Sequence, residues 1–147
     1  MKKLGIEDLD VKGKRVLMRV DFNVPQNEDG TVRDDTRIRA ALPSINYVRE
    51  RGGMLILMSH LGRPKDAAKA ESEEEKTKII EKNALLKMDP IADKLRELIT
   101  GAEALRAPGG NVKKLDALVG PDVETAVAEM RLGDVIVLEN TRFNKGE

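Results

Sequence analysis

Three arginines and the only histidine of the chain stand where apolar runs end or a helical pattern begins. His60 and Arg63 follow one run in "LMSHLGRP", Arg142 follows another in "VIVLENTRF", and Arg37 lies at the start of "TRIRAALPSI". Two unit charges 4 Å apart repel by roughly 4 kcal/mol at an effective dielectric near 20, so four such cations brought together would be unfavourable alone. A bound anion reverses the sign of that interaction.

The residue types indicate what the anion would be. The planar guanidinium group of arginine matches phosphate and carboxylate oxygens, and each charge-assisted hydrogen bond contributes about 1.5–3 kcal/mol. Asp21 and Asn23 lie near the end of the run "RVLMRVDFNV". Asp21 is suited to holding an arginine or accepting a hydroxyl of the ligand, and Asn23 could accept the hydroxyl as a neutral partner. Taken singly, each of these residues is equally typical of a turn or a surface ion pair. Together they predict a small, polyanionic, hydroxylated ligand.

Three short apolar runs must position these residues, at 15–24, 53–60 and 133–143. Each is rich in branched residues and is bounded by Gly or Pro, which is typical of strands buried on both faces. A weaker pattern at 112–116 predicts a further short strand.

Helical patterns lie between the apolar runs. The first is capped by Asp35 or Thr36 and contains Pro43, which should bend the helix or shift its start. Two more are expected at 89–101, ending at Gly101, and at 120–130. This alternation predicts an α/β fold with a mostly parallel sheet. Because ligands bind at the carboxyl ends of such strands, the cations are expected to share one rim of the sheet.

Two segments are predicted to lie outside this framework. Residues 26–35, with Asp29-Gly30 at their centre, indicate a tight reversal or small hairpin. The charge-rich segment 65–87 is typical of a solvated helix or a mobile loop. The sequence contains no internal repeat and no Gly/Ser linker, so a single domain over 1–147 is expected.

The composition excludes several functions. The 26 basic and 26 acidic residues give a formal net charge of +0, so no global field favours nucleic acid or a membrane surface. Cysteine is absent, which is typical of a reducing cytosol. No apolar run of about 18 residues indicates a membrane span, and the start "MKKLGIEDLD" resembles no signal peptide. We expect a cytoplasmic protein with no nucleic-acid or membrane partner.

The usual cofactor motifs are also missing from the sequence. Neither GxxxxGK[ST] nor GxGxxG occurs, and no acidic or histidine cluster has the spacing of metal ligands. We therefore expect no nucleotide, magnesium or other metal site in this chain.

Four stretches are specific enough to indicate a family: "KGKRVLMRVDFNVP", "DDTRIRAALPSI", "LMSHLGRP" and "GDVIVLENTRFNKGE". In order and in spacing they resemble the amino-terminal half of phosphoglycerate kinase. The resemblance covers most of the chain outside 65–88, and the segment 65–87 is longer than in many members of that family. It implies a Rossmann-like three-layer fold and a two-lobed, usually monomeric enzyme of glycolysis. One lobe binds 3-phosphoglycerate or 1,3-bisphosphoglycerate, the other binds Mg-ADP or Mg-ATP, and the acyl phosphate of 1,3-bisphosphoglycerate passes to ADP.

The resemblance also assigns roles to individual residues. Arg37 is expected to be catalytic, by stabilising the transferring phosphoryl group. The carboxylate and hydroxyl region of the ligand would lie against Asp21 and Asn23. The full set of expected substrate-binding residues is Asp21, Phe22, Asn23, Arg37, His60, Leu61, Gly62, Arg63 and Arg142.

The chain ends at Glu147, where members of that family continue. We therefore expect an incomplete amino-terminal lobe that binds phosphoglycerate weakly, lacks the nucleotide-binding domain and is inactive alone. Two alternatives remain open: a noncatalytic small-anion binding domain that uses the same arginines, and a structural module in which the arginines only pair with carboxylates.

Overall fold

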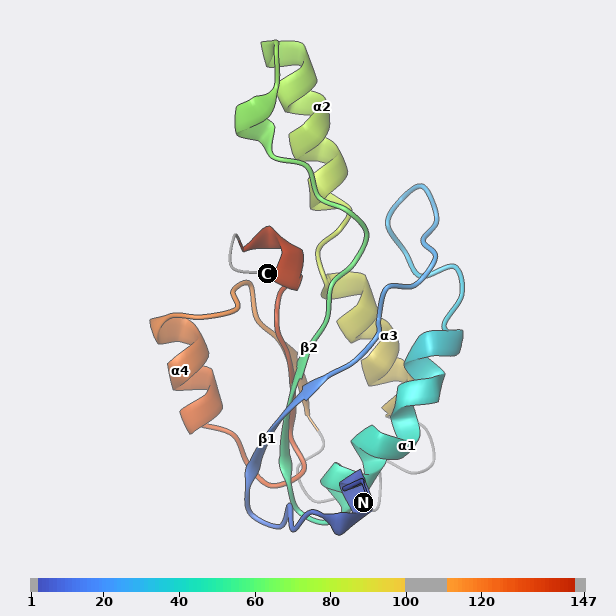
Figure 1. Ribbon diagram of the computed structural model, residues 1–147, viewed down its shortest axis with the longest axis vertical. Coiled ribbons are helices and arrows are strands. Elements are labelled where there is room, and N and C mark those ends of the chain that lie inside the picture. The colour runs from blue at the N-terminus through green and yellow to red at the C-terminus, as the bar shows by residue number, and fades with distance from the viewer. Residues whose placement is uncertain (1–2, 100–110, 145–147) are drawn as a thin grey trace.

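A parallel sheet of four strands forms the centre of the fold (Figure 1), in the order β1-β2-β4-β3. The computed structural model describes residues 3–99 and 111–144. The strands are β1 (Arg15–Arg19), β2 (Met54–Met58), β3 (Val112–Lys114) and β4 (Val135–Val137). All pairings between these strands are parallel, which confirms the predicted sheet and the short strand near 112–116.

Helices cover both faces of the sheet and make three layers, as expected (Figure 1). Leu55 and Leu57 of β2 belong to one apolar cluster, with residues of α1 (Thr36–Glu50) and α3 (Asp89–Ile99). Ile56 points to the other face and belongs to a second cluster, with residues of α4 (Pro121–Ala128). Because successive side chains of a strand alternate between faces, an all-apolar strand such as β2 can serve both clusters.

Strand β1 differs from the prediction in length and in burial. It ends at Arg19 rather than near residue 24, and its side chains alternate between exposed and half-buried. The reason is its position at one edge of the sheet, where Leu17 is 60% exposed although Arg15 Nε donates to the Val127 carbonyl of α4. The prediction that this run is covered on both faces is therefore wrong.

The run 133–143 also forms a shorter strand than predicted. β4 spans Val135–Val137, and the chain then turns into the short 3-10 helix η4 (Thr141–Phe143). The side chain of Asn140 caps η4 by accepting a hydrogen bond from the N–H of Arg142 at 3.0 Å. This cap ends the extended backbone before Arg142.

Helix α1 begins at Thr36, with Asp35 at the N-cap position. The Asp35 side chain makes no capping hydrogen bond, and Asp34 Oδ1 instead accepts the N–H of Thr36 at 2.8 Å. Pro43 lies inside the helix, so the prediction of a shifted start is wrong. Its exposed ring lies on the solvent side of the helix, away from the sheet.

The two peripheral segments match their predictions. Residues 26–35 reverse direction through an antiparallel bridge between Gln26 and Val32. The segment 65–87 contains α2 (Glu73–Ala84), which has no buried residue and projects away from the sheet (Figure 1). The predicted stop of the third helix at Gly101 lies outside the described residues. Within residues 3–99 and 111–144, no helix has the length and apolar character needed to cross a membrane.

Candidate functional site

The loop after β1 and the first turn of α1 meet at the carboxyl edge of the sheet. Arg37 Nη1 donates to Asp21 Oδ1 at 3.2 Å and to the backbone carbonyl of Asn23 at 2.8 Å. Both charged side chains of this pair are more than half exposed. Asp21 therefore orients the Arg37 guanidinium group while leaving it open to a ligand.

Gly62 connects this loop with the loops that follow β2 and β4. Its N–H donates to Asn23 Oδ1 at 2.8 Å, and its carbonyl accepts a hydrogen bond from Arg142 Nη1 at 2.8 Å. Residues separated by up to 121 positions in sequence, Asp21 and Arg142, thus belong to one connected set of contacts. We call the loops after β1, β2 and β4, with the first turn of α1, the rim.

Two buried polar side chains hold the backbone of the rim from below. The hydroxyl group of Ser59 accepts the N–H of Phe22 at 3.0 Å, and the Phe22 ring is fully buried in the core. Asn140 Oδ1 accepts the N–H of Leu61 at 3.2 Å, and Asn140 Nδ2 donates to the Leu61 carbonyl at 2.7 Å. Phe22 and Leu61 therefore anchor the rim through their side chains and leave their neighbours at the surface.

His60 and Arg63 lie on the loop after β2, on either side of Leu61 and Gly62. His60 is half-buried and Arg63 is exposed. Neither side chain forms a hydrogen bond or an ion pair with another of the described residues. Within residues 3–99 and 111–144, Arg63 is thus a cation of the rim that forms no ion pair with a carboxylate.

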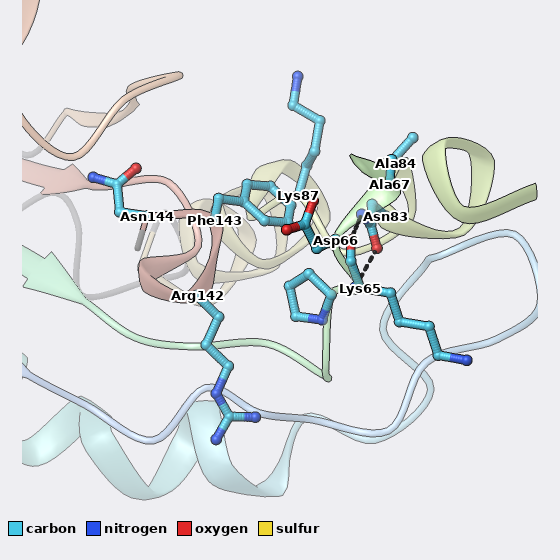
Figure 2. A pocket seen from close by; sticks show the side chains of 10 residues that line it. Lys65, Asp66, Ala67, Asn83, Ala84, Lys87, Arg142, Phe143 and Asn144 are labelled. Atoms are coloured by element: carbon cyan, nitrogen blue, oxygen red, sulfur yellow. Dashed lines mark hydrogen bonds between the residues drawn. The ribbon is translucent and has the colours of Figure 1, made fainter. Parts of the chain in front are cut away.

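Two open pockets flank the rim. One, of about 480 Å³, lies between β1 and α1 and is lined partly by Arg19, Asp21 and Arg37. The other, of about 490 Å³, lies between η4 and the two ends of the segment that carries α2. Figure 2 shows this second pocket, with the Arg142 side chain extending away from Lys87 and Phe143. Each pocket therefore presents at least one arginine to solvent.

A comparison with protein families identifies the family of the chain. The family model described as phosphoglycerate kinase matches residues 6–147. The chain belongs to the phosphoglycerate kinase family. Phosphoglycerate kinase of Fervidobacterium nodosum is 47% identical over 147 residues, and that of Chloroflexus aurantiacus is 45% identical over the same length.

Solved structures give the same result. Phosphoglycerate kinase of Pyrococcus horikoshii superposes on 96% of this chain with a TM-score of 0.71 and 28% identity. That of Coxiella burnetii covers 98% of the chain with a TM-score of 0.66 and 28% identity. The chain covers 28% and 29% of these two structures. It spans about a third of the length of the curated phosphoglycerate kinases that it matches, 31–32%.

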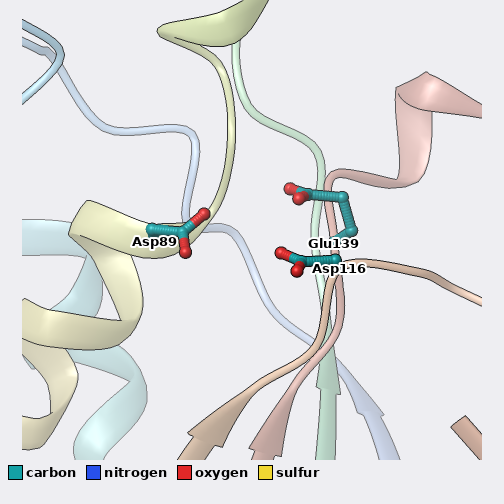
Figure 3. A group of neighbouring side chains, drawn as sticks. All are labelled: Asp89, Asp116 and Glu139. Atoms are coloured by element: carbon teal, nitrogen blue, oxygen red, sulfur yellow. The ribbon is translucent and has the colours of Figure 1, made fainter. Parts of the chain in front are cut away.

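Three carboxylates beside the rim contact a lysine. Asp89, Asp116 and Glu139 bring ligand atoms within 4.8 Å of one another (Figure 3). Lys114 Nζ lies 2.7 Å from Asp89 Oδ2, 2.8 Å from Asp116 Oδ1 and 2.6 Å from Glu139 Oε2. Its ammonium group lies among the three carboxylates, where a metal ion would be held, so this cluster does not fit a magnesium ion. We call these four residues the lysine cluster.

The contacts of the lysine cluster shift the pKa values of Lys114 and Asp116. Burial of the Lys114 ammonium group disfavours its charged form, but the hydrogen bonds that this group donates to Asp116, Asp89 and Glu139 outweigh this effect and raise its pKa. The hydrogen bond to Lys114 lowers the pKa of Asp116. Lys114 and Asp116 are therefore both charged throughout the neutral range.

Sequence reasoning missed three residues that build the rim and its support: Ser59, Glu139 and Asn140. Asn140 is fully buried and Glu139 is 4% exposed, although both types are usually found at protein surfaces. The available signal was the pair Glu139-Asn140, which directly follows the apolar run "VIVL". Polar side chains at the end of a buried strand have little access to water, so the pair indicates hydrogen bonds within the protein. The sequence could not show which backbone groups these side chains bind.

Replacing Gly62 by alanine is expected to destabilise the rim. Gly62 has φ +60°, and an added Cβ atom would lie 2.6 Å from Leu86 Cδ2. The left-handed conformation costs a residue with a Cβ atom about 1–2 kcal/mol, and movement of Leu86 adds to this. Gly13→Ala is the matched control, because Gly13 has φ +70° but no atom within 4 Å of the added Cβ. Urea denaturation should show a larger loss for Gly62→Ala, and equal losses would contradict the predicted clash.

Proposed function

We propose that the chain forms the phosphoglycerate-binding part of a phosphoglycerate kinase, which transfers the acyl phosphate of 1,3-bisphosphoglycerate to ADP. The supporting observation is the rim itself, where Arg37 donates to the Asn23 carbonyl, the N–H of Gly62 donates to Asn23 Oδ1 and Arg142 donates to the Gly62 carbonyl, each at 2.8 Å. Membership of the family gives this basic rim its expected ligand.

The cations of the rim would bind the charged ends of the ligand. Arg63, His60 and Arg142 would contact phosphate or carboxylate oxygens, where the fork of arginine permits two parallel hydrogen bonds. Arg37 would stabilise the charge on the transferring phosphoryl group, because phosphoryl transfer depends on positioning and on cations directed at the equatorial oxygens. Asp21 would maintain the orientation of Arg37 during this step through their hydrogen bond.

The hydrogen bonds refine the role that the sequence suggested for Asn23. Its Oδ1 atom already accepts the N–H of Gly62, so only one lone pair of this oxygen is left for a ligand hydroxyl. Its Nδ2 group has no hydrogen-bond partner among the described residues. In our proposal Asn23 therefore donates to an oxygen of the ligand, and Asp21 Oδ2 is left to accept the hydroxyl.

We assign Mg-ADP and Mg-ATP to a part of the kinase outside this chain. No residue of the rim forms a phosphate loop, and the lysine cluster does not fit magnesium. The proposal includes a monomeric, cytoplasmic enzyme, as the family resemblance implies. The chain alone would then bind phosphoglycerate and form no ATP. ATP production from 1,3-bisphosphoglycerate and ADP by this chain alone would contradict this division.

Titration with 3-phosphoglycerate tests the proposed ligand. Calorimetry or chemical-shift mapping should show binding of 3-phosphoglycerate, with changes centred on residues 21–23, 37, 60–63 and 142. Inorganic phosphate should bind more weakly and glycerol not at all, because each presents only part of the ligand. Equal binding of phosphate would support a general small-anion domain instead. Binding of neither would support a structural module.

A further inference from the structure

Asn140 lies beneath the rim and is fully buried. Its Nδ2 group donates to the carbonyls of Leu61 at 2.7 Å and Leu86 at 2.9 Å. Its Oδ1 atom accepts the N–H groups of Leu61 at 3.2 Å and Arg142 at 3.0 Å. Every hydrogen-bonding position of this amide is therefore used within the protein, and none faces a ligand.

These contacts join segments that are far apart in sequence. Leu61 precedes Asn140 by 79 residues and Leu86 precedes it by 54. Leu61 stands between His60 and Gly62, while the Arg142 N–H opens the turn that directs the Arg142 side chain towards Gly62. One side chain therefore sets the distance between the loop after β2 and the arginine that follows β4.

Asn140 is itself held from behind by the lysine cluster. Its N–H donates to Glu139 Oε1 at 2.9 Å, and the same oxygen accepts the N–H of Met88 at 2.9 Å. The other carboxylate oxygen of Glu139 contacts Lys114 Nζ. Asn140 is thus fixed on both sides, by charged groups below it and by the rim above it.

We propose that Asn140 is a positioning residue for phosphoglycerate binding: it keeps the His60–Arg63 loop and Arg142 at the separation that one anion requires. This inference rests on the proposed function of the rim. Asn140 acts through the backbone of Leu61 and Arg142 and does not touch the ligand. A misplacement of about 1 Å in such a site is sufficient to lower binding or activity by an order of magnitude or more.

Two substitutions separate positioning from simple capping of η4. Serine is also a favoured capping residue, so Asn140→Ser retains an oxygen for the Arg142 N–H. Its side chain is too short to bind both backbone groups of Leu61. Asn140→Ala removes the cap and the connection together. If positioning matters, both variants should bind 3-phosphoglycerate about tenfold more weakly than wild type; rescue by serine would overturn the proposal.

Coupling to Arg142 gives a readout that a general loss of stability would not change. Arg142→Ala should weaken binding less in the Asn140→Ser background than in wild type, because the arginine is already misplaced there. Val123→Ala is the control. Val123 is a residue of α4 that packs in the second apolar cluster, so its replacement by alanine should destabilise the fold away from the rim. Its effect should be additive with that of Arg142→Ala. Additive effects for Asn140→Ser would overturn the proposal.

A measurement without ligand separates this inference from the proposed function. In Asn140→Ser, the amide resonances of Leu61, Gly62 and Arg142 should shift and the Leu61 N–H should exchange faster with solvent. Failure of wild type to bind 3-phosphoglycerate, with these amide changes present, would overturn the proposed function and leave the link between the loops established. Unchanged amide resonances and exchange would overturn the positioning role itself.

Discussion

Replacing Lys114 by methionine is expected to lower the free energy of unfolding by about 3–5 kcal/mol at neutral pH, because removing one partner leaves a buried charge without compensation. The Lys114 side chain is 7% exposed and its partner Glu139 is 5% exposed. Methionine has a similar length and lacks the ammonium group, so the change removes the charge with little change in packing. Urea denaturation at pH 7 measures the effect.

The pH dependence of the variant follows from the same charges. In wild type the pKa of Lys114 is raised, so its contribution is fully present below the unfolded value of about 10.4 and is lost only as pH rises through the folded value. Without the ammonium group, burial and nearby Asp89 and Asp116 should raise the pKa of Glu139 in the folded state. The deficit of Lys114→Met should therefore shrink as pH falls from the raised folded value of Glu139 towards its unfolded value of about 4.3.

Lys113→Met provides the control for this experiment. Lys113 is the neighbouring residue of β3 and is exposed, so its replacement should change the free energy of unfolding by less than about 0.5 kcal/mol. Equal losses for the two variants, or a deficit of Lys114→Met that stays constant down to pH 3, would contradict the central role of the lysine cluster.

Replacing Arg63 by alanine is expected to weaken 3-phosphoglycerate binding by about 10- to 150-fold. This range corresponds to the roughly 1.5–3 kcal/mol that a hydrogen bond to a charged group contributes. The free energy of unfolding should stay within about 0.5 kcal/mol of wild type, because the exposed side chain has no bonded partner among the described residues. Calorimetric titration and urea denaturation measure the two quantities separately.

Arg131→Ala controls for the general loss of one positive charge. Arg131 is also exposed, but it precedes β4 and therefore lies near the opposite end of the sheet. Its removal should change the affinity for 3-phosphoglycerate by less than about twofold, since charges beyond about 10 Å are largely screened at ordinary ionic strength. Similar losses in both variants would indicate that the ligand responds to net charge rather than to the rim.

The sequence predicts the layers of this fold more accurately than the limits of its strands. The run from Met54 to Met58 is apolar throughout, and both faces of β2 are covered. The run that begins at Arg15 is less apolar, with Arg15 and Arg19 on the exposed face of β1, and it forms an edge strand because burial also depends on which strands become neighbours. Strand order is set by contacts between distant segments, and no local pattern specifies it.

For the candidate site, the sequence predicts which residues lie together but not the contacts that hold them. Parallel strands place their carboxyl ends at one edge, so the sequence predicts that Arg37, Arg63 and Arg142 lie on one rim. The connections through Gly62 and Asn140 use backbone groups, which every residue possesses, and sequence therefore cannot distinguish them. Sequence also does not specify that Lys114 fills the space between three carboxylates.

The order of the strands has a consequence for synthesis of the protein. β4 is the last of the four strands along the chain, yet it lies between β2 and β3. β1 and β2 can pair with each other and pack against α1 as soon as residue 58 has left the ribosome. In contrast, β3 has no partner in the sheet until β4 emerges. At about 5–20 residues per second, β3 would wait at least one second for this partner. During a pause of the ribosome before Val135, the sheet would therefore remain incomplete, with β3 still unpaired.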